Sequence, residues 1–218
     1  MTKRNILAIA PHADDVEIAM GGTIARYVDE GHNVTIVTAI IPQEDSKGKV
    51  DKFMTDNRLN EQKNAAAVLG ANLDVMNLDP YEFGYNRKFI KIFDEKINFY
   101  KPDIIFSCWE HDTHQDHKNL AQILFSVTRK NNISFNMYEV MLPGGINTYA
   151  FNPQYFVNIS KHIEKKIEAI KCYKSVFENK KNNYSRYFES ILGRAKFRGE
   201  VIGVDYAEAF VVAKKIEI

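Results

Sequence analysis

Along the first two thirds of the chain, short apolar runs alternate with segments in which apolar residues recur at helical spacing. The apolar runs are continuous and end at polar residues, as expected for strands that are buried on both faces of a parallel sheet. They predict four strands: residues 5–10, 34–41, 73–76 and 103–107.

The helical spacing is clearest in one segment, where Leu120, Ile123, Leu124 and Val127 fall at positions i, i+3, i+4 and i+7. Glycine and proline mark the ends of several other predicted helices. These helices are marked by Ile24, Ala25 and Val28 before Gly31, by residues 58–70 ending at Gly70, by residues 87–100 before Pro102, by Ile163, Ile167 and Ile170, and by Tyr187, Phe188, Ile191, Leu192 and Ala195. A final strand is predicted over residues 209–213.

Strand and helix alternate as far as about residue 140, which predicts βαβ units with right-handed crossovers. We therefore expect an α/β fold, a Rossmann-like three-layer αβα arrangement with a mostly parallel sheet. The chain has no internal repeat and no linker, so residues 1–218 are predicted to form a single domain.

Composition narrows the class of protein further. The 29 basic and 28 acidic residues give a net charge of +1, which argues against a nucleic-acid partner. The longest apolar stretches are too short to span a bilayer, and the polar residues 11–15 interrupt the first apolar run too early for a signal peptide. Cys108 and Cys172 form no disulfide framework. We expect a cytoplasmic protein with no transmembrane segment and no nucleic-acid partner.

Two polar clusters follow two of the predicted strands. Residues 11–17 read Pro-His-Ala-Asp-Asp-Val-Glu after the first strand, and residues 110–117 read Glu-His-Asp-Thr-His-Gln-Asp-His after the strand at 103–107. Four of the six histidines lie in these segments. Ligands of open parallel sheets bind beyond the carboxyl ends of strands, so we expect both clusters to line one site.

Imidazole and carboxylate groups together predict a metal site. Catalytic zinc keeps three protein ligands and leaves one position for water. His12 and Asp15 are candidates for two ligands, and the third is expected from residues 111–117. We favour His117, because it lies where the following helix begins. The same ligand set also suits Fe²⁺, Co²⁺ or Mn²⁺.

The remaining polar residues suggest catalytic roles. Asp14 is left beside the metal, where a metallohydrolase places its general base. His114 is a candidate for stabilising an oxyanion or protonating a leaving amine. Asp116 or Asp112 is expected to hold the tautomer of His114 from behind.

Simpler interpretations exist for individual residues. Paired aspartates after a strand often only cap a helix. We interpret His32 and His162 as exposed residues at helix boundaries, and the lysines within residues 161–181 as the solvated face of a helix. Glu17 either supports the metal loop or is an acid favoured by the helix dipole.

The motifs resemble those of the PIG-L/LmbE-like zinc N-deacetylases. The family motif His-Pro-Asp-Asp reads His-Ala-Asp-Asp at residues 12–15, with Gly-Gly-Thr at 21–23, and His-Pro-Asp-His reads His-Gln-Asp-His at 114–117. Arg-x-x-Glu at 58–61 and Leu-Gly at 69–70 also match, and Tyr-Ala-Glu-Ala-Phe at 206–210 is similar to a late family feature. Prolines are replaced by Ala13 and Gln115, and Val176 stands where many relatives have Gln.

The resemblance implies a hydrolase that removes an N-acetyl group from an amino sugar, in an N-acetylglucosamine-type glycan, a glycoconjugate or a sugar nucleotide. It implies His12, Asp15 and His117 as zinc ligands, Asp14 as the base, His114 backed by Asp116 at the tetrahedral intermediate, and Arg58 as a substrate contact. It also implies a homo-oligomer, a trimer or a hexamer.

Other functions compete with this interpretation. A zinc amidase acting on a thiol conjugate and an O-acetyl esterase acting on a sugar would use the same site. A nucleotide-binding module is disfavoured, because the first loop lacks G-x-G-x-x-G and its acidic pair would repel a pyrophosphate. A non-catalytic zinc-binding role has no support, since every catalytic position of the motifs is filled.

Overall fold

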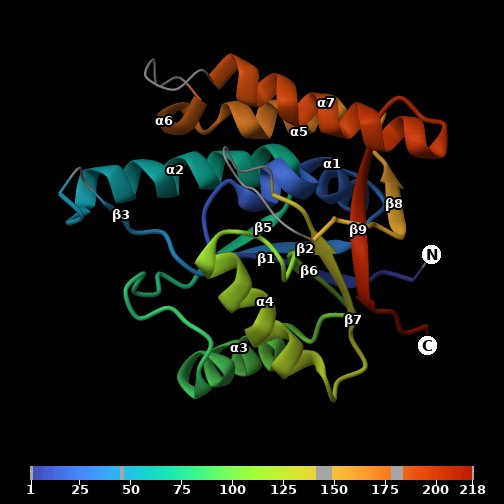
Figure 1. The fold of residues 1–218 in the computed structure, drawn as a ribbon. Coiled ribbons are helices and arrows are strands. Elements are labelled where there is room, and N and C mark those ends of the chain that lie inside the picture. The colour runs from blue at the N-terminus through green and yellow to red at the C-terminus, as the bar shows by residue number, and fades with distance from the viewer. Residues whose placement is uncertain (1, 45–46, 141–148, 178–183, 218) are drawn as a thin grey trace.

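A seven-stranded sheet forms the centre of the structure (Figure 1). The computed structural model describes residues 2–44, 47–140, 149–177 and 184–217. In order across the sheet, the strands are β5 (Asn72–Val75), β2 (Asn33–Thr38), β1 (Asn5–Ala10), β6 (Ile104–Cys108), β7 (Ser134–Tyr138), β9 (Ala207–Lys214) and β8 (Tyr155–Asn158). A separate two-stranded ribbon joins β3 (Gln43–Glu44) to β4 (Val50–Asp51).

The sheet is mostly parallel, which confirms the predicted fold class. β5, β2, β1, β6 and β7 run parallel to their neighbours, and only β9 pairs antiparallel, with β7 on one side and β8 on the other. β7 and β8 were not predicted, because residues 134–138 and 155–158 mix polar and apolar residues in very short runs. The long antiparallel strand β9 gives both of them a partner.

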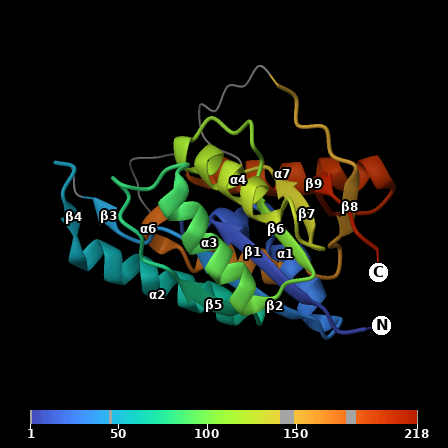
Figure 2. The same ribbon diagram turned by 90° about the horizontal axis from the view of Figure 1, so that it is seen from below.

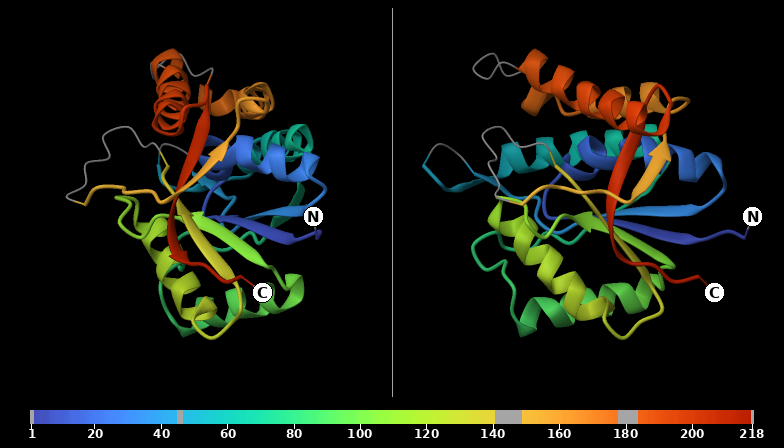
Figure 3. Two further views of the ribbon diagram at one scale, coloured as in Figure 1. Left: turned by 90° about the vertical axis from the view of Figure 1, so that its right-hand side faces the viewer. Right: turned by 45° about the vertical axis from the view of Figure 1, so that its right-hand side comes forward.

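Helices cover both faces of this sheet. α3 (Arg87–Tyr100) and α4 (Gln115–Thr128) lie on one face, whereas α1 (Asp15–Asp29) and α2 (Lys52–Leu69) lie on the other (Figures 1 and 2). α5 (Ile163–Lys171), α6 (Lys174–Phe177) and α7 (Tyr184–Ile202) lie beyond α1 and α2 (Figure 3). Among the described residues, no helix combines the length and the apolar content that crossing a membrane requires.

Alternate residues of β1 enter two hydrophobic cores. Ile6 and Ala8 pack in the core beneath α1 and α2, and Leu7 and Ile9 pack in the core beneath α3 and α4. This arrangement explains the continuous apolar run of β1, because both faces of the strand are covered.

The helix boundaries agree with the sequence pattern at most ends. α3 has the predicted bounds, and α2 ends before Gly70, whose φ of 72° is the left-handed conformation that glycine adopts readily. α2 begins at Lys52, earlier than predicted, because the Asp51 carboxylate caps it by accepting a hydrogen bond from the Met54 amide at 2.8 Å. Its first turns are largely exposed, so they carry no apolar period.

α1 begins at Asp15, before the predicted Ile24 segment, and is interrupted at Met20, where φ is −142° and ψ is 22°. Both oxygens of the Glu208 carboxylate accept hydrogen bonds at the restarted helix, from the amides of Gly22 (3.1 Å) and Thr23 (2.6 Å). Lys166 pairs with Glu208 and donates to the carbonyl oxygen of Ile18 at 2.8 Å. The carboxylate and the ammonium group thus replace backbone hydrogen bonds that the interruption removes.

The expectation of a fully solvated lysine face is therefore wrong for Lys166, which is 1% exposed. Its helix α5 packs against α1, and this position faces the interrupted turn rather than solvent. Lys180 and Lys181 lie outside the described residues.

Candidate active site and metal centre

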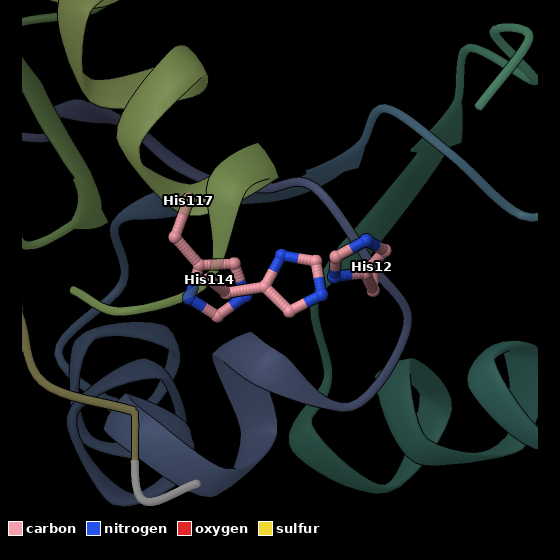
Figure 4. Close-up of side chains that lie close together, drawn as sticks. All are labelled: His12, His114 and His117. Carbon is pink, nitrogen blue, oxygen red and sulfur yellow. The ribbon is translucent and has the colours of Figure 1, made fainter. Parts of the chain in front are cut away.

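The two polar clusters meet because β1 and β6 are parallel neighbours in the sheet. His12 follows the carboxyl end of β1, and Asp15 is the first residue of α1. His114 is the N-cap of α4, and His117 lies in the first turn of that helix. The imidazoles of His12, His114 and His117 lie close together, on segments that are about one hundred residues apart in the chain (Figure 4).

One oxygen of the Asp15 carboxylate lies between two imidazoles. Asp15 Oδ2 is 3.4 Å from His12 Nδ1 and 3.4 Å from His117 Nε2. The His117 side chain is 1% exposed, yet its Nε2 has no hydrogen-bond partner. A buried nitrogen without a partner is costly, so this atom is placed to bind a ligand that protein atoms do not supply.

The second nitrogen of each of these imidazoles contacts a carboxylate. His117 Nδ1 lies 3.0 Å from Asp112 Oδ2, and His12 Nε2 lies 3.0 Å from Asp116 Oδ2. Metal-binding histidines commonly have such a carboxylate on the nitrogen remote from the metal, because it fixes the ring orientation and tautomer.

The Asp116 carboxylate, which was expected to hold His114, lies 4.0 Å from His114 Nδ1, beyond hydrogen-bond distance. His114 Nδ1 instead accepts a hydrogen bond from the backbone amide of Asp116 at 3.1 Å. The Asp112 carboxylate accepts one from the backbone amide of His114 at 2.8 Å. With Nδ1 acting as an acceptor, the proton of neutral His114 lies on Nε2, which is therefore a hydrogen-bond donor.

Buried charges shift the pKa values of these ligand candidates. Burial alone would lower the pKa of His12, but hydrogen bonds to Asp116 and Asp15 outweigh it and raise that pKa to about 9. Burial would also lower the pKa of His117, but the effects of Cys108, Asp15 and Asp112 outweigh burial and raise that pKa. The pKa of Asp15 is lowered, because the neighbouring His117 and His12 outweigh burial. The cluster thus attracts cations, and a metal would displace the imidazole protons.

Asp14 has a strained backbone, and its carboxylate does not cap the helix. Its φ of 93° places it in the left-handed region, and although it occupies the N-cap position of α1 its side chain makes no capping hydrogen bond. Burial and the charge of Asp15 raise the pKa of Asp14 to about 7. The simple capping interpretation therefore does not account for this residue.

Arg58 on α2 reaches across to Asp14. Its Nη1 lies 3.4 Å from Asp14 Oδ2, and Glu61 and Ser175 contact the same guanidinium at 3.4 and 3.3 Å. Glu61 also accepts hydrogen bonds from the amide and the hydroxyl of Ser175, at 2.7 and 2.6 Å. Through Arg58 and Glu61, the sequence motif at 58–61 thus connects α2 to Asp14 and to Ser175 of α6. Val176, which replaces the family Gln, packs against the hydrophobic core.

Sequence reasoning gave no site role to Cys108. Its Sγ, Asp15 and His117 offer ligand atoms within 4.8 Å of one another, and all three residues are buried. Burial raises the pKa of the Cys108 thiol. The sequence did contain one signal for a site role of Cys108, because this residue ends the β6 strand shortly before the second polar cluster.

Two further histidines, His32 and His162, lie away from this cluster, as expected, but they are not simply exposed. His162 is the N-cap of α5 and its Nε2 lies 2.9 Å from Asp29 Oδ2. The His32 side chain is 9% exposed and its Nδ1 accepts a hydrogen bond from the Arg4 amide at 3.3 Å. Both stabilise local structure after or before a helix.

Comparison with known proteins gives three informative similarities. The diacetylchitobiose deacetylase of Thermococcus kodakarensis is 27% identical over 223 residues, which cover 94% of this chain and 81% of that protein. The N,N′-diacetylchitobiose deacetylase of Pyrococcus horikoshii has a structure with a TM-score of 0.80 at 24% identity, covering 95% of this chain and 82% of that one.

The 4-carboxy-2-hydroxymuconate hydratase of Pseudomonas putida KT2440 has a similar fold as well, with a TM-score of 0.77 at 18% identity, covering 99% of this chain and 98% of that one. The fold therefore hosts more than one reaction, and the assignment of chemistry depends on the site residues.

The family model described as GlcNAc-PI de-N-acetylase, PIG-L, matches residues 7–128, more than half of the 218 residues. The matched residues include both polar clusters and the motif at 58–61, which contribute to the candidate site. The chain belongs to the PIG-L family.

Proposed function

We propose that this protein is a zinc-dependent hydrolase that removes the N-acetyl group from an amino sugar and releases acetate and the free amine. The observation that carries the proposal is the placement of Asp15 Oδ2 at 3.4 Å from both His12 Nδ1 and His117 Nε2. Two relatives are named as deacetylases of diacetylchitobiose, which supports an acetylated amino sugar as the substrate class.

The distances from Asp15 Oδ2 to the two imidazole nitrogens suit zinc. Zinc binds imidazole nitrogen and carboxylate oxygen at about 2.0–2.1 Å in tetrahedral sites, so two of its ligand atoms lie about 3.3 Å apart. His12, Asp15 and His117 would hold the ion, and Asp116 and Asp112 would orient the two imidazoles. A bound zinc would supply Lewis acidity towards the acetamide oxygen and lower the pKa of water.

The residues around this position have matching roles. Asp14 would take a proton from the attacking water, because its half-buried carboxylate directly precedes the ligand candidate Asp15 in the chain and makes no capping hydrogen bond. Arg58 would hold the Asp14 carboxylate in place and favour its ionised form. His114 would donate a hydrogen bond from Nε2 to the developing oxyanion, and a proton from Asp14 or His114 would pass to the departing amine.

The first experiment measures metal content of the purified protein together with acetate release from N-acetylglucosamine and N,N′-diacetylchitobiose. We expect about one zinc per chain, as a three-ligand catalytic site implies, and loss of acetate release after chelation. A folded protein that takes up no metal from metal-replete buffer would refute the site assignment.

The choice between amide and ester chemistry needs a matched substrate panel. We expect acetate from N-acetylated sugars and much less from O-acetylated sugars that lack an amide. Turnover of only the O-acetylated sugars, or only of a thiol-conjugated amide, would replace the proposal by the corresponding esterase or amidase.

A further inference from the structure

Four aromatic side chains form a cluster beside the metal centre. Trp109 meets His111 edge to face, with ring centroids 5.3 Å apart, and His111 stacks on Tyr149 at 4.2 Å with an interplanar angle of 16°. Phe151 meets Trp109 edge to face at 5.4 Å. We refer to Trp109, His111, Tyr149 and Phe151 as the aromatic platform. The proposed mechanism uses none of them.

The platform continues directly into the site. Trp109 follows the last residue of β6, and its carbonyl accepts a hydrogen bond from the Asp112 amide at 3.1 Å. The Asp112 carboxylate in turn contacts His117. One short turn therefore connects the platform to the segment that carries His114 and His117.

Arg198 packs against one member of the platform, whereas another member, Tyr149, is exposed. The Arg198 guanidinium lies over the Phe151 ring, 5.5 Å from its centroid, and makes an ion pair with Glu139 at 2.7 Å. Tyr149, in contrast, is 62% exposed even though His111 covers one face of its ring. A fixed aromatic surface beside a site is a preorganised binding surface, because little side-chain entropy is lost when a ligand docks.

The charges around the platform favour an uncharged ligand. Glu110 lies 3.9 Å from the imidazole of His111, and the carboxylates of Asp112 and of Asp116, in the first turn of α4, contact His117 and His12. Arg198, whose guanidinium lies over the Phe151 ring, is paired with Glu139. A pyrophosphate would meet negative charge here, so the platform disfavours a sugar nucleotide.

We propose that the aromatic platform binds a second, uncharged sugar ring that is joined to the N-acetylated ring in the metal site. This inference rests on the proposed deacetylase function. A pyranose ring with equatorial substituents presents axial C–H groups on both faces, and these positively polarised hydrogens stack on the negative face of an aromatic ring. The substrate class is then an amino-sugar oligosaccharide rather than a free monosaccharide. Tyr149 and Phe151 lie outside the family match at 7–128.

The chain offers a direct probe, because Trp109 is its single tryptophan. The experiment titrates metal-loaded Asp14→Asn protein with N,N′-diacetylchitobiose, N-acetylglucosamine or UDP-N-acetylglucosamine and follows Trp109 fluorescence. We expect the disaccharide to change the emission and to bind about tenfold more tightly than the monosaccharide, since one aromatic stacking contact contributes on that order.

Tyr149→Ala, added to Asp14→Asn, is expected to abolish this tenfold preference while leaving monosaccharide affinity unchanged. The matched control is Tyr85→Ala, an exposed tyrosine whose hydroxyl contacts Ser126 near the opposite end of α4, and it should retain the preference. Equal affinity for one and two rings, tightest binding of the nucleotide sugar, or an unchanged preference in the Tyr149→Ala protein would each overturn the proposal.

Acetate release from the wild-type enzyme separates this inference from the proposed function. A disaccharide preference without acetate release would keep the platform and refute deacetylation. Acetate release with no disaccharide preference would keep deacetylation and refute the platform.

Discussion

At the scale of single residues, the backbone conformation of Asp14 and the hydrogen bonds of the imidazoles carry the chemistry. Asp14 occupies a helix N-cap yet leaves its carboxylate unused for capping, with a φ of 93°. Non-glycine residues in this region cost of order 1–3 kcal/mol, so the surrounding structure must impose the conformation. The imidazoles of His12 and His117 each direct one nitrogen at Asp15 and the other at a separate carboxylate.

Asp14→Asn should abolish turnover without loss of metal. The amide cannot accept the proton from water, and general-base catalysis contributes on the order of 10²–10⁴ in rate. The measurement is kcat with metal content determined on the same sample. Substantial kcat in metal-loaded Asp14→Asn protein would exclude Asp14 as the base.

Arg58→Met should move the acid limb of the pH–rate profile to higher pH. Activity requires ionised Asp14, so it is lost as pH falls through the pKa of Asp14. The charge of Arg58 lowers that pKa, and its removal should raise the limb by on the order of one unit. The kcat/KM profiles of both proteins, each loaded with the same metal, give the shift. A profile that falls uniformly at all pH values would assign Arg58 to substrate binding alone.

Asp112→Ala should weaken metal binding by about 10–100-fold, because Asp112 orients His117. A competition titration with a chelator of known affinity measures this. If Asp112 served His114 instead, metal affinity would be kept and only kcat would fall, so the two readouts separate the alternatives.

At the scale of elements, side chains from β9 and α5 form hydrogen bonds with backbone groups at the interruption of α1. Its break at Met20 leaves amides and a carbonyl without helical partners, and Glu208 on β9 and Lys166 on α5 satisfy them. Gly22 lies at the same place, where a Cβ would approach Ile159 to 2.7 Å. The Gly-Gly-Thr segment thus serves the close packing of α1, and the late Glu serves its restarted turn.

Glu208→Gln should destabilise the protein by about 3–5 kcal/mol, because it leaves Lys166 buried and without a counter-ion. Chemical denaturation at fixed metal content measures the loss. The matched control is Asp29→Asn, which breaks the exposed ion pair with Lys165, weakens the contact with His162, and should cost about 1 kcal/mol or less. If both variants lost a similar free energy of unfolding, the buried pair would contribute no more to stability than the exposed one.

At the scale of the whole molecule, the site depends on the order of strands in the sheet. β1 and β6 are adjacent although nearly one hundred residues separate them, and each delivers ligand candidates at its carboxyl end. A metal that binds both segments therefore links the two halves of the sheet, and binding energy becomes folding energy.

Zinc should raise the free energy of unfolding by about 2.7 kcal/mol when its free concentration is 100 times Kd. We expect one cooperative transition for the metal-free protein, as a single domain requires, and a higher midpoint with zinc. His117→Ala should show no such rise. Two separate transitions, or equal zinc stabilisation of the His117→Ala protein, would contradict the single-domain prediction or the ligand assignment respectively.

The sequence by itself determined the α/β class, most strands and helices, the family, and the residue types available for a metal. These follow from local signals: apolar runs, helical spacing, caps and motifs within a few residues of each other. α3 has the predicted bounds, because both its apolar spacing and its end signals are local.

Only the tertiary structure decided which groups pair. The contacts between Asp116 and His12, Arg58 and Asp14, and Lys166 and Glu208 each join residues that are far apart in the chain. The strands β7 and β8 and the aromatic platform also depend on such neighbours. Strand order and register set these distances, and no local sequence pattern encodes them. The residue types of the candidate site could therefore be predicted from the sequence, whereas the contacts between their side chains could not.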